Sequence, residues 1–394
     1  MIVNEDCIKH LKTIEDNYFD SVVTDPPYEL GFMGKGWDST GIAFTTELWK
    51  EVYRTLKPGG YLLSFAASRN YHRMAVAIED SGFEIRDQIM WIYGSGFPKG
   101  LNIGKSIDKK LGNKRKVIGT KHNTYDGAIR NPENHKSPAE LSNIGKWGLN
   151  QTPHGLLETK GNSEYEGWGT ALKPAHEPIC MARKPISEKS LTDNVLKHGT
   201  GGINIDGCRV TTDENISNHS RSAESAISKG IFGDSKEQET HQTQGQKLGR
   251  YPANLIHDGS DEVVSKFPNT KSGKDKNPTT ENVSGFFGQD MGYYSKDANY
   301  GDEGSAARFF YCPKANKKEK GDSKHPTVKP VELMRYLVRL VTPKDGIVLD
   351  PFAGTGTTGE ACILENRNYY LIEAEESYIK DIETRTNKYN RLGL

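Results

Sequence analysis

The sequence lacks paired cysteines, long apolar runs and an excess of charge of either sign. Five cysteines are scattered through 394 residues without a Cys-x-x-Cys pair, so we expect neither a zinc site nor a disulfide framework. No segment approaches the roughly 18 apolar residues of a membrane span, and the first residues show no signal-peptide pattern. Lys and Arg number 52, as do Asp and Glu, so total charge does not indicate a nucleic-acid partner. We expect a cytoplasmic protein with no membrane association and no metal.

Strand and helix signals alternate at both ends of the chain, whereas the middle is polar and irregular. The predicted strands are residues 21–24, 61–65, 88–92, 347–350 and 369–373. The predicted helices are residues 45–56, 71–80, 331–341, 357–365 and 377–389. Strands separated by helices are typical of a parallel sheet covered on both faces.

A glycine-rich loop, Asp350-Pro351-Phe352-Ala353-Gly354-Thr355-Gly356, follows one of the C-terminal strands. Together with Gly359 it fits G-x-G-x-x-G, which permits a tight turn and close approach of backbone to a ligand. Glu373 ends the next strand, where an acid can accept hydrogen bonds from ribose hydroxyls. This pattern fits a nicotinamide dinucleotide as well as S-adenosylmethionine, and it also fits a turn that simply requires glycine.

The position of the glycine loop near the C-terminus restricts the fold. Only 35 residues follow Gly359, which is too few to complete a doubly wound sheet. The missing strands must therefore come from the N-terminal segment. Asp25, at the end of an N-terminal strand, is then expected on the same carboxyl edge as the glycine loop. Open α/β sheets bind their ligands along that edge.

The tetrapeptide Asp25-Pro26-Pro27-Tyr28 carries the chemistry of an amino-group site. An exocyclic amine on adenine or cytosine is a poor nucleophile because its lone pair is delocalised into the ring. The Asp25 side chain and the Pro26 carbonyl can each accept one N–H, which draws the nitrogen toward tetrahedral geometry. The prolines stiffen the backbone, and the Tyr28 ring can stack on the base. The alternative is a strand-to-loop turn, for which the same residue types are common.

These residues resemble the β class of S-adenosylmethionine-dependent DNA amino-methyltransferases, in which the motif order is permuted. Asp25 to Tyr28 is similar to the catalytic motif of that class, and Asp350 to Gly356 to its cofactor motif. Asp6 looks like the acid that contacts the cofactor's adenine. The segment 325–330 is similar to the lead-in to the helix before the cofactor strand. Short phrases at 31–35, 250–254 and 308–311 look like phage or prophage members.

The resemblance implies a circularly permuted, Rossmann-like α/β methyltransferase fold with a mostly parallel sheet, helices on both faces and an inserted, irregular target-recognition region. Residues 1–186 would form the catalytic half, with a polar insert at about 100–168. Residues 187–311 would recognise the target, and residues 312–394 would form the cofactor half. The implied substrate is a base flipped out of double-stranded DNA. A homodimer and a cognate restriction nuclease are left open.

The resemblance assigns roles residue by residue. Catalysis is assigned to Asp25, Pro26, Pro27 and Tyr28. Binding of S-adenosylmethionine is assigned to Asp6, Asp25, Thr327, Lys329, Asp350, Phe352, Ala353, Gly354, Gly356, Thr357, Thr358 and Glu373. A basic segment beside aromatic residues is predicted to follow the phosphate backbone of DNA, through Arg308, Lys314, Lys317 and Lys318.

An aspartate at the first position of the catalytic motif favours adenine N6, whereas serine there is commoner for cytosine N4. Cytosine N4 remains the first alternative. An RNA or protein methyltransferase, a nicotinamide-dependent dehydrogenase and a catalytically inactive DNA-binding module are the others. Trp37 and Asp38 are candidates for closing the pocket. Trp91 and Phe97 are candidates for lining it, although core packing is the favoured explanation for Trp91. The segment His176-Glu177-Pro178 precedes an apolar strand near where the family often places a pocket aromatic, and no such aromatic is obvious.

Overall fold

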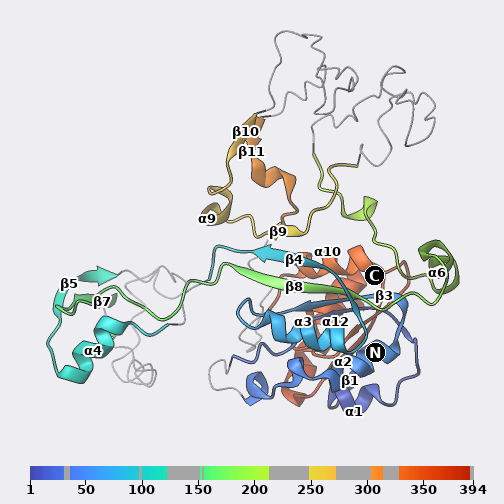
Figure 1. Cartoon of the computed structure of the whole chain (residues 1–394), viewed down its shortest axis with the longest axis horizontal. Coiled ribbons are helices and arrows are strands. Elements are labelled where there is room, and N and C mark those ends of the chain that lie inside the picture. Colours follow the sequence, from blue (N-terminus) through green and yellow to red (C-terminus); the bar gives the residue numbers. More distant parts are fainter. Residues whose placement is uncertain are drawn as a thin grey trace, which may run out of the picture. The chain divides into compact units, whose positions relative to one another are not determined.

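The structure is a computed structural model that describes residues 1–30, 36–96, 100–121, 151–152, 155–212, 248–271, 303–313 and 328–390. The chain forms two compact units (Figure 1). The larger unit joins Met1–Ser95 to Ala175–Leu394, and the smaller unit is Gly96–Pro174. Each is described by itself below.

The larger unit is built on a mostly parallel sheet. Its eight described strands lie in the order β1 (Ile2–Asn4), β13 (Asn368–Glu373), β12 (Ile347–Asp350), β2 (Phe19–Thr24), β3 (Leu56–Phe65), β8 (His176–Arg183), β4 (Glu84–Ile92) and β9 (Leu255–His257). Only β8 runs antiparallel to its neighbours; every other pair of these described strands is parallel. The predicted α/β architecture with a mostly parallel sheet is confirmed.

The two ends of the chain interleave at the centre of this sheet. β12 pairs with β2, so that Leu349 lies opposite Val22. β1 pairs with β13, so that Ile2 lies opposite Leu371. Residues more than 300 positions apart in sequence are therefore hydrogen-bonded neighbours, which confirms the prediction that the N-terminal segment completes the C-terminal half.

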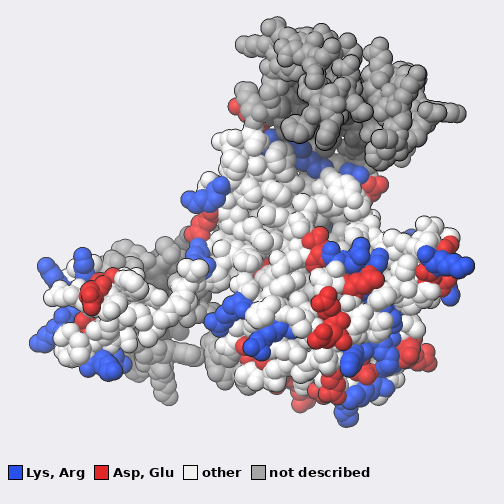
Figure 2. Space-filling view, in the orientation of Figure 1, with Lys and Arg blue, Asp and Glu red and all other residues white. Residues whose placement is uncertain are grey.

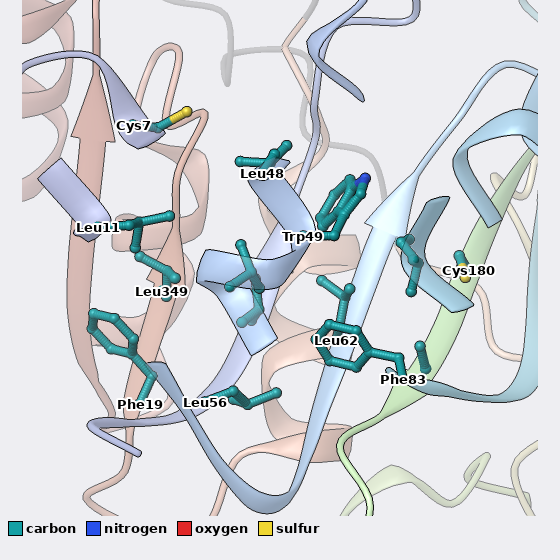
Figure 3. Close-up of a cluster of buried hydrophobic side chains, with 14 of the residues drawn as sticks. Cys7, Leu11, Phe19, Leu48, Trp49, Leu56, Leu62, Phe83, Cys180 and Leu349 are labelled. Carbon is teal, nitrogen blue, oxygen red and sulfur yellow. The ribbon is translucent and has the colours of Figure 1, made fainter. Parts of the chain in front are cut away.

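Helices cover both faces of the sheet because successive strand residues point to opposite sides. Val22 packs with Leu48 and Trp49 in one apolar cluster, shown in part in Figure 3, whereas Val23 belongs to a second cluster with Leu337. The helices of the first face are α1 (Cys7–Leu11), α2 (Thr46–Thr55) and α3 (Tyr71–Asp80). Those of the second face are α10 (Val331–Val341), α11 (Thr357–Leu364) and α12 (Glu376–Asn390).

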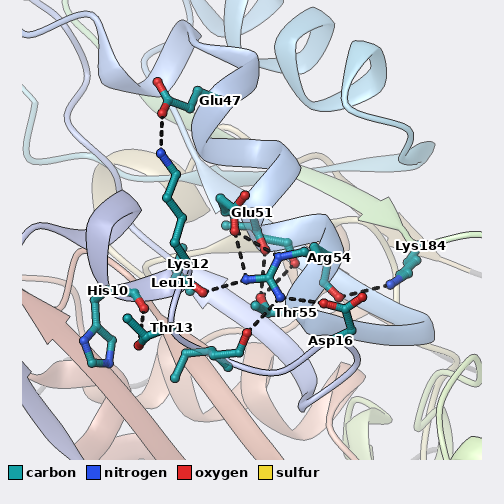
Figure 4. Close-up of polar contacts among 12 residues, drawn as sticks. His10, Leu11, Lys12, Thr13, Asp16, Glu47, Glu51, Arg54, Thr55 and Lys184 are labelled. Carbon is teal, nitrogen blue, oxygen red and sulfur yellow. Dashed lines mark hydrogen bonds and ion pairs between the residues drawn. The ribbon is translucent and has the colours of Figure 1, made fainter.

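Two cations fix the chain just before β2 (Figure 4). The Arg54 guanidinium donates to the carbonyl oxygens of Leu11 at 2.7 Å and Ile14 at 2.8 Å. Lys184 Nζ donates to the Leu56 carbonyl at 2.7 Å and to Asn17 Oδ1 at 2.8 Å, and burial lowers its pKa to about 8. These bonds tie carbonyl groups at the end of α1, just after it and at the start of β3 to side chains, and they help to hold the start of β2.

The region 187–311 contributes to the sheet as well as carrying short elements of its own. β9 extends the sheet beside β4 through the pair Trp91 and Ile256. The other described elements of this region are α6 (Leu191–His198), α9 (Asp261–Val264), β10 (Asn269–Lys271), β11 (Glu303–Ser305) and the 3₁₀ turns η5 (Asp206–Cys208) and η6 (Ala306–Phe309). Two further 3₁₀ turns, η2 (Gly36–Ser39) and η3 (Ile42–Phe44), precede α2. The limits of a target-recognition region remain a prediction.

The described residues of the smaller unit form one helix and an antiparallel sheet. Its elements are α4 (Ile103–Leu111), β5 (Lys116–Lys121), β6 (Gln151–Thr152) and β7 (Gly155–Lys160), with the strand order β5-β7-β6. The Asn102 side chain accepts the Lys105 N–H at 2.9 Å and caps α4, which stabilises its first turn. Arg115 forms ion pairs with Asp108 and Glu166 and so ties the helix to the loop after β7.

Candidate active site

The Asp25–Tyr28 tetrapeptide and the glycine loop meet at the carboxyl edge of the central sheet. Asp25 follows β2 directly, and Asp350 is the last residue of β12. Because β2 and β12 are parallel neighbours, both strands end at this edge. The Thr24 hydroxyl donates to Asp350 Oδ1 at 2.7 Å. One hydrogen bond therefore joins the residue before the tetrapeptide to the first residue of the glycine loop.

Both oxygens of the Asp350 carboxylate accept hydrogen bonds from within the protein. Besides Thr24, it accepts the Phe352 N–H at 3.1 Å and the Thr358 hydroxyl at 2.5 Å. Burial raises its pKa to about 6, against the opposing effect of these hydrogen bonds. Both oxygens hold the start of the loop and the first turn of α11. Asp350 therefore shapes the loop around the site.

The glycine loop turns on left-handed backbone. Gly354 has φ +52° and Gly356 has φ +80°, a region that other residues avoid. The Gly354 N–H donates to Glu373 Oε2 at 2.7 Å, and the Glu375 N–H donates to Glu373 Oε1 at 2.9 Å. Burial raises the pKa of Glu373 to about 6. Each Glu373 oxygen accepts one backbone bond, which leaves lone pairs for a ligand's hydroxyl groups.

The two carboxylate oxygens of Asp25 differ in their surroundings. Oδ2 accepts a charge-assisted hydrogen bond from Lys329 Nζ at 2.7 Å. Oδ1 is buried and has no hydrogen-bond partner among the described residues. A buried acceptor without a donor is costly, and a substrate N–H placed at this atom would satisfy it.

Tyr28 is held at both ends. Its carbonyl accepts from Asn70 Nδ2 at 2.6 Å. Its hydroxyl donates to Glu177 Oε2 at 2.8 Å and accepts from Lys329 Nζ at 3.0 Å. Burial, followed by the charges of Asp25 and Glu177, raises the pKa of Tyr28 well above its ordinary value, so the phenol stays neutral and able to donate.

Asp38 fixes the backbone that follows the tetrapeptide. Its carboxylate, in a side chain that is 2% exposed, accepts the N–H groups of Glu29 at 2.9 Å and Leu30 at 3.3 Å. Glu29 has φ +55°, a strained conformation that such bonds help to hold. The sequence predicts that Asp38 helps to close the pocket, and in the structure it anchors the loop after Tyr28.

Comparison with known proteins gives a match to one family model. The model for DNA methylases that modify N6 or N4 positions (N6_N4_Mtase) matches residues 19–384, which is most of the chain. The chain belongs to this family of DNA methylases. Its cofactor is S-adenosylmethionine.

Individual relatives match this chain over different shares of their length. The chain is 47% identical to the Type II methyltransferase M2.MboI of Moraxella bovis over 62 residues, which are 16% of this chain and 23% of that protein. It is 21% identical to the Type II methyltransferase M.HindIII of Haemophilus influenzae, covering all of this chain and 95% of that protein. The chain thus matches about a quarter of the length of the first of these curated relatives and nearly all of the second.

Solved structures overlap this chain at low similarity. The complex of M1.HpyAVI with SAM is 16% identical, with a TM-score of 0.40, and covers 98% of each chain. The PvuII DNA methyltransferase, described as cytosine-N4-specific, is 15% identical, with a TM-score of 0.39, and covers 99% of this chain and 91% of that chain. The family assignment rests on the match to the family model.

The residues at the glycine loop fit S-adenosylmethionine. Glu373 keeps acceptor capacity for ribose hydroxyls, and the left-handed Gly354 and Gly356 bring backbone to the same edge. Asn4 pairs with Glu373, which places Asp6 two residues beyond the end of β1 at this edge. Asp6 is exposed, and its Oδ1 accepts the Lys9 N–H at 2.9 Å as the cap of α1. Phe352, Ala353 and Thr357 lie in or directly after the loop.

The structure does not place every predicted residue at this site. Thr327, Lys314, Lys317, Lys318 and Phe97 lie outside the described residues, as does the side chain of Trp37. The Arg308 Nη1 group donates to the carbonyl oxygens of Gly304 at 2.7 Å and Ser305 at 2.8 Å, and to Thr270 Oγ1 at 3.0 Å. Its contact with DNA phosphate stays a prediction, and the structure gives this guanidinium a role in holding the paired strands β10 and β11.

The structure shows contacts of Lys329 and Glu177 that the sequence did not predict. The resemblance assigns Lys329 to cofactor binding, which stays a prediction, and in the structure its Nζ contacts Asp25, Tyr28 and Glu177. Glu177 lies opposite Trp91 in the β4–β8 register, and Trp91 Nε1 is buried without a partner among the described residues. A carboxylate at the start of an otherwise apolar strand was the one available signal for Glu177.

Proposed function

We propose that this DNA methylase transfers a methyl group from S-adenosylmethionine to the N6 amine of an adenine flipped out of double-stranded DNA. The observation that supports it best is the buried, unpartnered Oδ1 of Asp25 beside the cofactor loop. Flipping costs a few kcal/mol of unstacking. The aspartate at position 25 favours adenine through the resemblance of this motif to N6 enzymes.

In the proposed mechanism the protein orients the amine. One N–H donates to Asp25 Oδ1 and the other to the Pro26 carbonyl, which localises the nitrogen lone pair toward the methyl donor. Tyr28 stacks on the base, a contact worth about 1–3 kcal/mol. The sulfonium of the bound cofactor supplies an activated methyl group. The remaining catalysis is alignment and fixed electrostatics, for which no protein nucleophile is needed.

The proposed cofactor site assigns the ribose hydroxyls to Glu373 and the adenine to Asp6 and Phe352. Gly354 and Gly356 give close backbone approach, and Ala353 precedes them. Thr357 lies at the start of α11, where the helix N-terminus favours the methionine carboxylate. Asp350 and Thr358 act indirectly, because their hydrogen bond is internal.

Cofactor affinity should depend on pH through Glu373. Its pKa is raised to about 6 by burial, and only the ionised form can accept from both ribose hydroxyls. The affinity should therefore weaken as pH falls, by roughly tenfold between pH 7 and pH 5. Equilibrium dialysis of labelled S-adenosylmethionine measures this. Glu373→Gln should bind weakly with a nearly flat profile; an unchanged slope in that variant would remove Glu373 from the proposed site.

The function is tested by incubating the protein with unmethylated genomic DNA and methyl-labelled S-adenosylmethionine, followed by mass spectrometry of the nucleosides. Labelled N6-methyladenine is the expected product. Labelled N4-methylcytosine would retain the orientation mechanism and replace the proposed base. A protein that binds the cofactor and labels neither nucleoside would contradict the proposal.

A further inference from the structure

We propose that Lys329 and Glu177 are positioning residues for the base-binding side of the site, and that Lys329 holds Asp25 so that Oδ1 faces the target amine. This inference rests on the proposed amino-methyl transfer and deepens it. It assigns Lys329 to the base-binding side of the site, whereas the resemblance implies a role in binding the cofactor.

The distances describe a closed set of contacts around one ammonium group. Lys329 Nζ lies 2.7 Å from Asp25 Oδ2, 3.0 Å from the Tyr28 hydroxyl and 3.2 Å from Glu177 Oε2. The Tyr28 hydroxyl in turn donates to Glu177 at 2.8 Å. All three Nζ protons of a lysine ammonium therefore have an acceptor within this group.

The surroundings shield these contacts from water. The Lys329 side chain is 10% exposed, compared with 26% for Asp25 and 18% for Glu177. The ammonium also lies 4.7 Å from the centre of the Phe65 ring and 5.1 Å from that of Tyr28. Buried ion pairs with good geometry are strongly directional, so this cluster fixes the rotation of the Asp25 carboxylate.

Three separate elements supply the cluster. Asp25 follows β2, Glu177 lies in β8, and Lys329 precedes α10. Lys329 contacts both carboxylates, and the Tyr28 hydroxyl contacts Glu177 and Lys329. The effect of Glu177 on Asp25 therefore passes through these two residues. That arrangement makes Glu177 the residue that keeps the lysine charged and correctly placed. Its carboxylate supplies a second negative charge beside the ammonium, so that Asp25 alone does not have to balance the cation while it also binds the substrate.

The charge balance sets the protonation of Lys329. Burial lowers its pKa, but the charges of Asp25 and Glu177 outweigh burial and raise that pKa above its ordinary value. The groups that face the ammonium are Asp25, Tyr28 and Glu177, and Tyr93 faces Glu177 with a pKa that burial raises. Removal of the Glu177 charge should lower the pKa of Lys329, so that Lys329 loses its proton at a lower pH.

The test compares Glu177→Gln and Lys329→Met with the wild type in kcat on DNA, in the pH profile of kcat and in the Kd of S-adenosylmethionine. We expect each variant to lower kcat by about 100-fold, the effect of a misplaced reacting group, with Kd within about twofold of wild type. The alkaline fall of kcat should move to lower pH in Glu177→Gln. Lys329→Arg, which keeps the charge, should recover part of the rate.

A matched control is Glu365→Gln. Glu365 is also a buried carboxylate between cations, with ion pairs to Arg335 and Arg339, but it lies at the end of α11 away from the tetrapeptide. It should lower the melting temperature without changing the pH profile of kcat. An unchanged kcat in Glu177→Gln, or a Kd about tenfold weaker in Lys329→Met at unchanged kcat, would overturn the inference. A wild-type protein that methylates no base would instead refute the proposed function.

A different observation carries a second proposal: we infer that the lysines of α4 and the segment after it contact the DNA backbone. Residues 96–174 contain 13 Lys and Arg against 7 Asp and Glu, whereas the rest of the chain contains 39 against 45. The positive charge of a neutral protein is thus concentrated in the smaller unit. Basic side chains are prominent on this unit in Figure 2.

The lysines in question are exposed: Lys105, Lys109, Lys110, Lys114 and Lys116. None of these five forms an ion pair with a described residue, whereas the neighbouring Arg115 forms ion pairs with Asp108 and Glu166. Lys105 and Lys109 are one helical turn apart and share a face of α4. Exposed lysines on one short element suit the phosphates of a duplex, which release counterions on contact.

DNA binding measured by fluorescence anisotropy at several salt concentrations tests this surface. Replacing Lys105, Lys109 and Lys110 by Gln should weaken binding and reduce the salt slope by about 1 for each lysine that contacts phosphate. The control replaces Lys50, Lys344 and Lys380, which are exposed lysines of the larger unit, by Gln. An unchanged salt slope in the first variant, or an equal change in both, would overturn the proposal.

Discussion

Asp25→Asn should abolish methyl transfer while leaving the affinity for S-adenosylmethionine nearly unchanged. An asparagine presents one carbonyl oxygen and one NH₂ group. If the oxygen faces Lys329, as Oδ2 does at 2.7 Å, the NH₂ group points at the incoming amine and two donors oppose each other. If the oxygen faces the amine, the NH₂ group opposes the ammonium. The first orientation loses the contact that the substrate requires, and the second loses the ion pair with Lys329 that holds the side chain at position 25.

The expected loss in single-turnover rate is about 1,000-fold, comparable to removal of one electrostatic contact to a reacting group. The measurement is product formation on DNA after rapid mixing, with the Kd of S-adenosylmethionine determined separately. Asp80→Asn, on the exposed end of α3, is the control and should behave as wild type. A fully active Asp25→Asn protein would remove Asp25 from the mechanism.

Gly356→Val should destabilise the protein and weaken cofactor binding, but for a reason that the sequence did not reveal. The sequence alone suggests that a side chain at this position fills the space where backbone meets ligand. In the structure a Cβ at Gly356 would lie 3.0 Å from Ile382 of α12, on backbone with φ +80°. The substitution therefore strains the loop and presses on α12, and the loss of cofactor affinity follows from the shifted loop.

Gly199 provides a matched control for this prediction. It has φ +74°, and a Cβ added there would have no neighbouring atom within 4 Å among the described residues. Gly199→Val should show the backbone strain alone, about 1–2 kcal/mol in the free energy of unfolding. Gly356→Val should lose clearly more in thermal melts and should also bind S-adenosylmethionine more weakly. Equal losses of stability in the two variants would show that contact with Ile382 is unimportant.

The sheet could be predicted from the sequence because its strands and helices carry strong local signals. The strand 347–350 and the helix 71–80 have the predicted limits, since each is bounded by turn residues and has a regular apolar pattern. The strand predicted at 61–65 begins earlier, at Leu56, so that residues 58–60 lie inside β3. Phe19 pairs with Leu56 and Ser21 with Tyr61, so the extra residues form an irregularity within the strand. Long-range pairing outweighs the local turn preference there.

The positions of site residues could be predicted where a sequence motif fixes the local backbone. They could not be predicted where a side chain contacts a residue that is distant in sequence. Asp25 and Asp350 could be placed at one edge because parallel strands end together. The destination of the Lys329 side chain could not, because Asp25 lies 304 positions away and Glu177 belongs to the antiparallel partner of β3. Likewise, the charge of Arg308 indicated DNA, whereas its geometry shows contacts with nearby carbonyl oxygens.

The hydrogen bond between Thr24 and Asp350 has a consequence for synthesis of the protein. Its partners lie 326 positions apart, and ribosomes add roughly 5–20 residues per second. The β2 edge that will carry Asp25 therefore waits on the order of tens of seconds for β12 to arrive. During that time it is an unpaired, apolar edge that invites aggregation. A nascent chain of this protein thus carries the proposed catalytic residue, Asp25, long before the strand that completes the site. We expect chaperone depletion to reduce the yield of active protein.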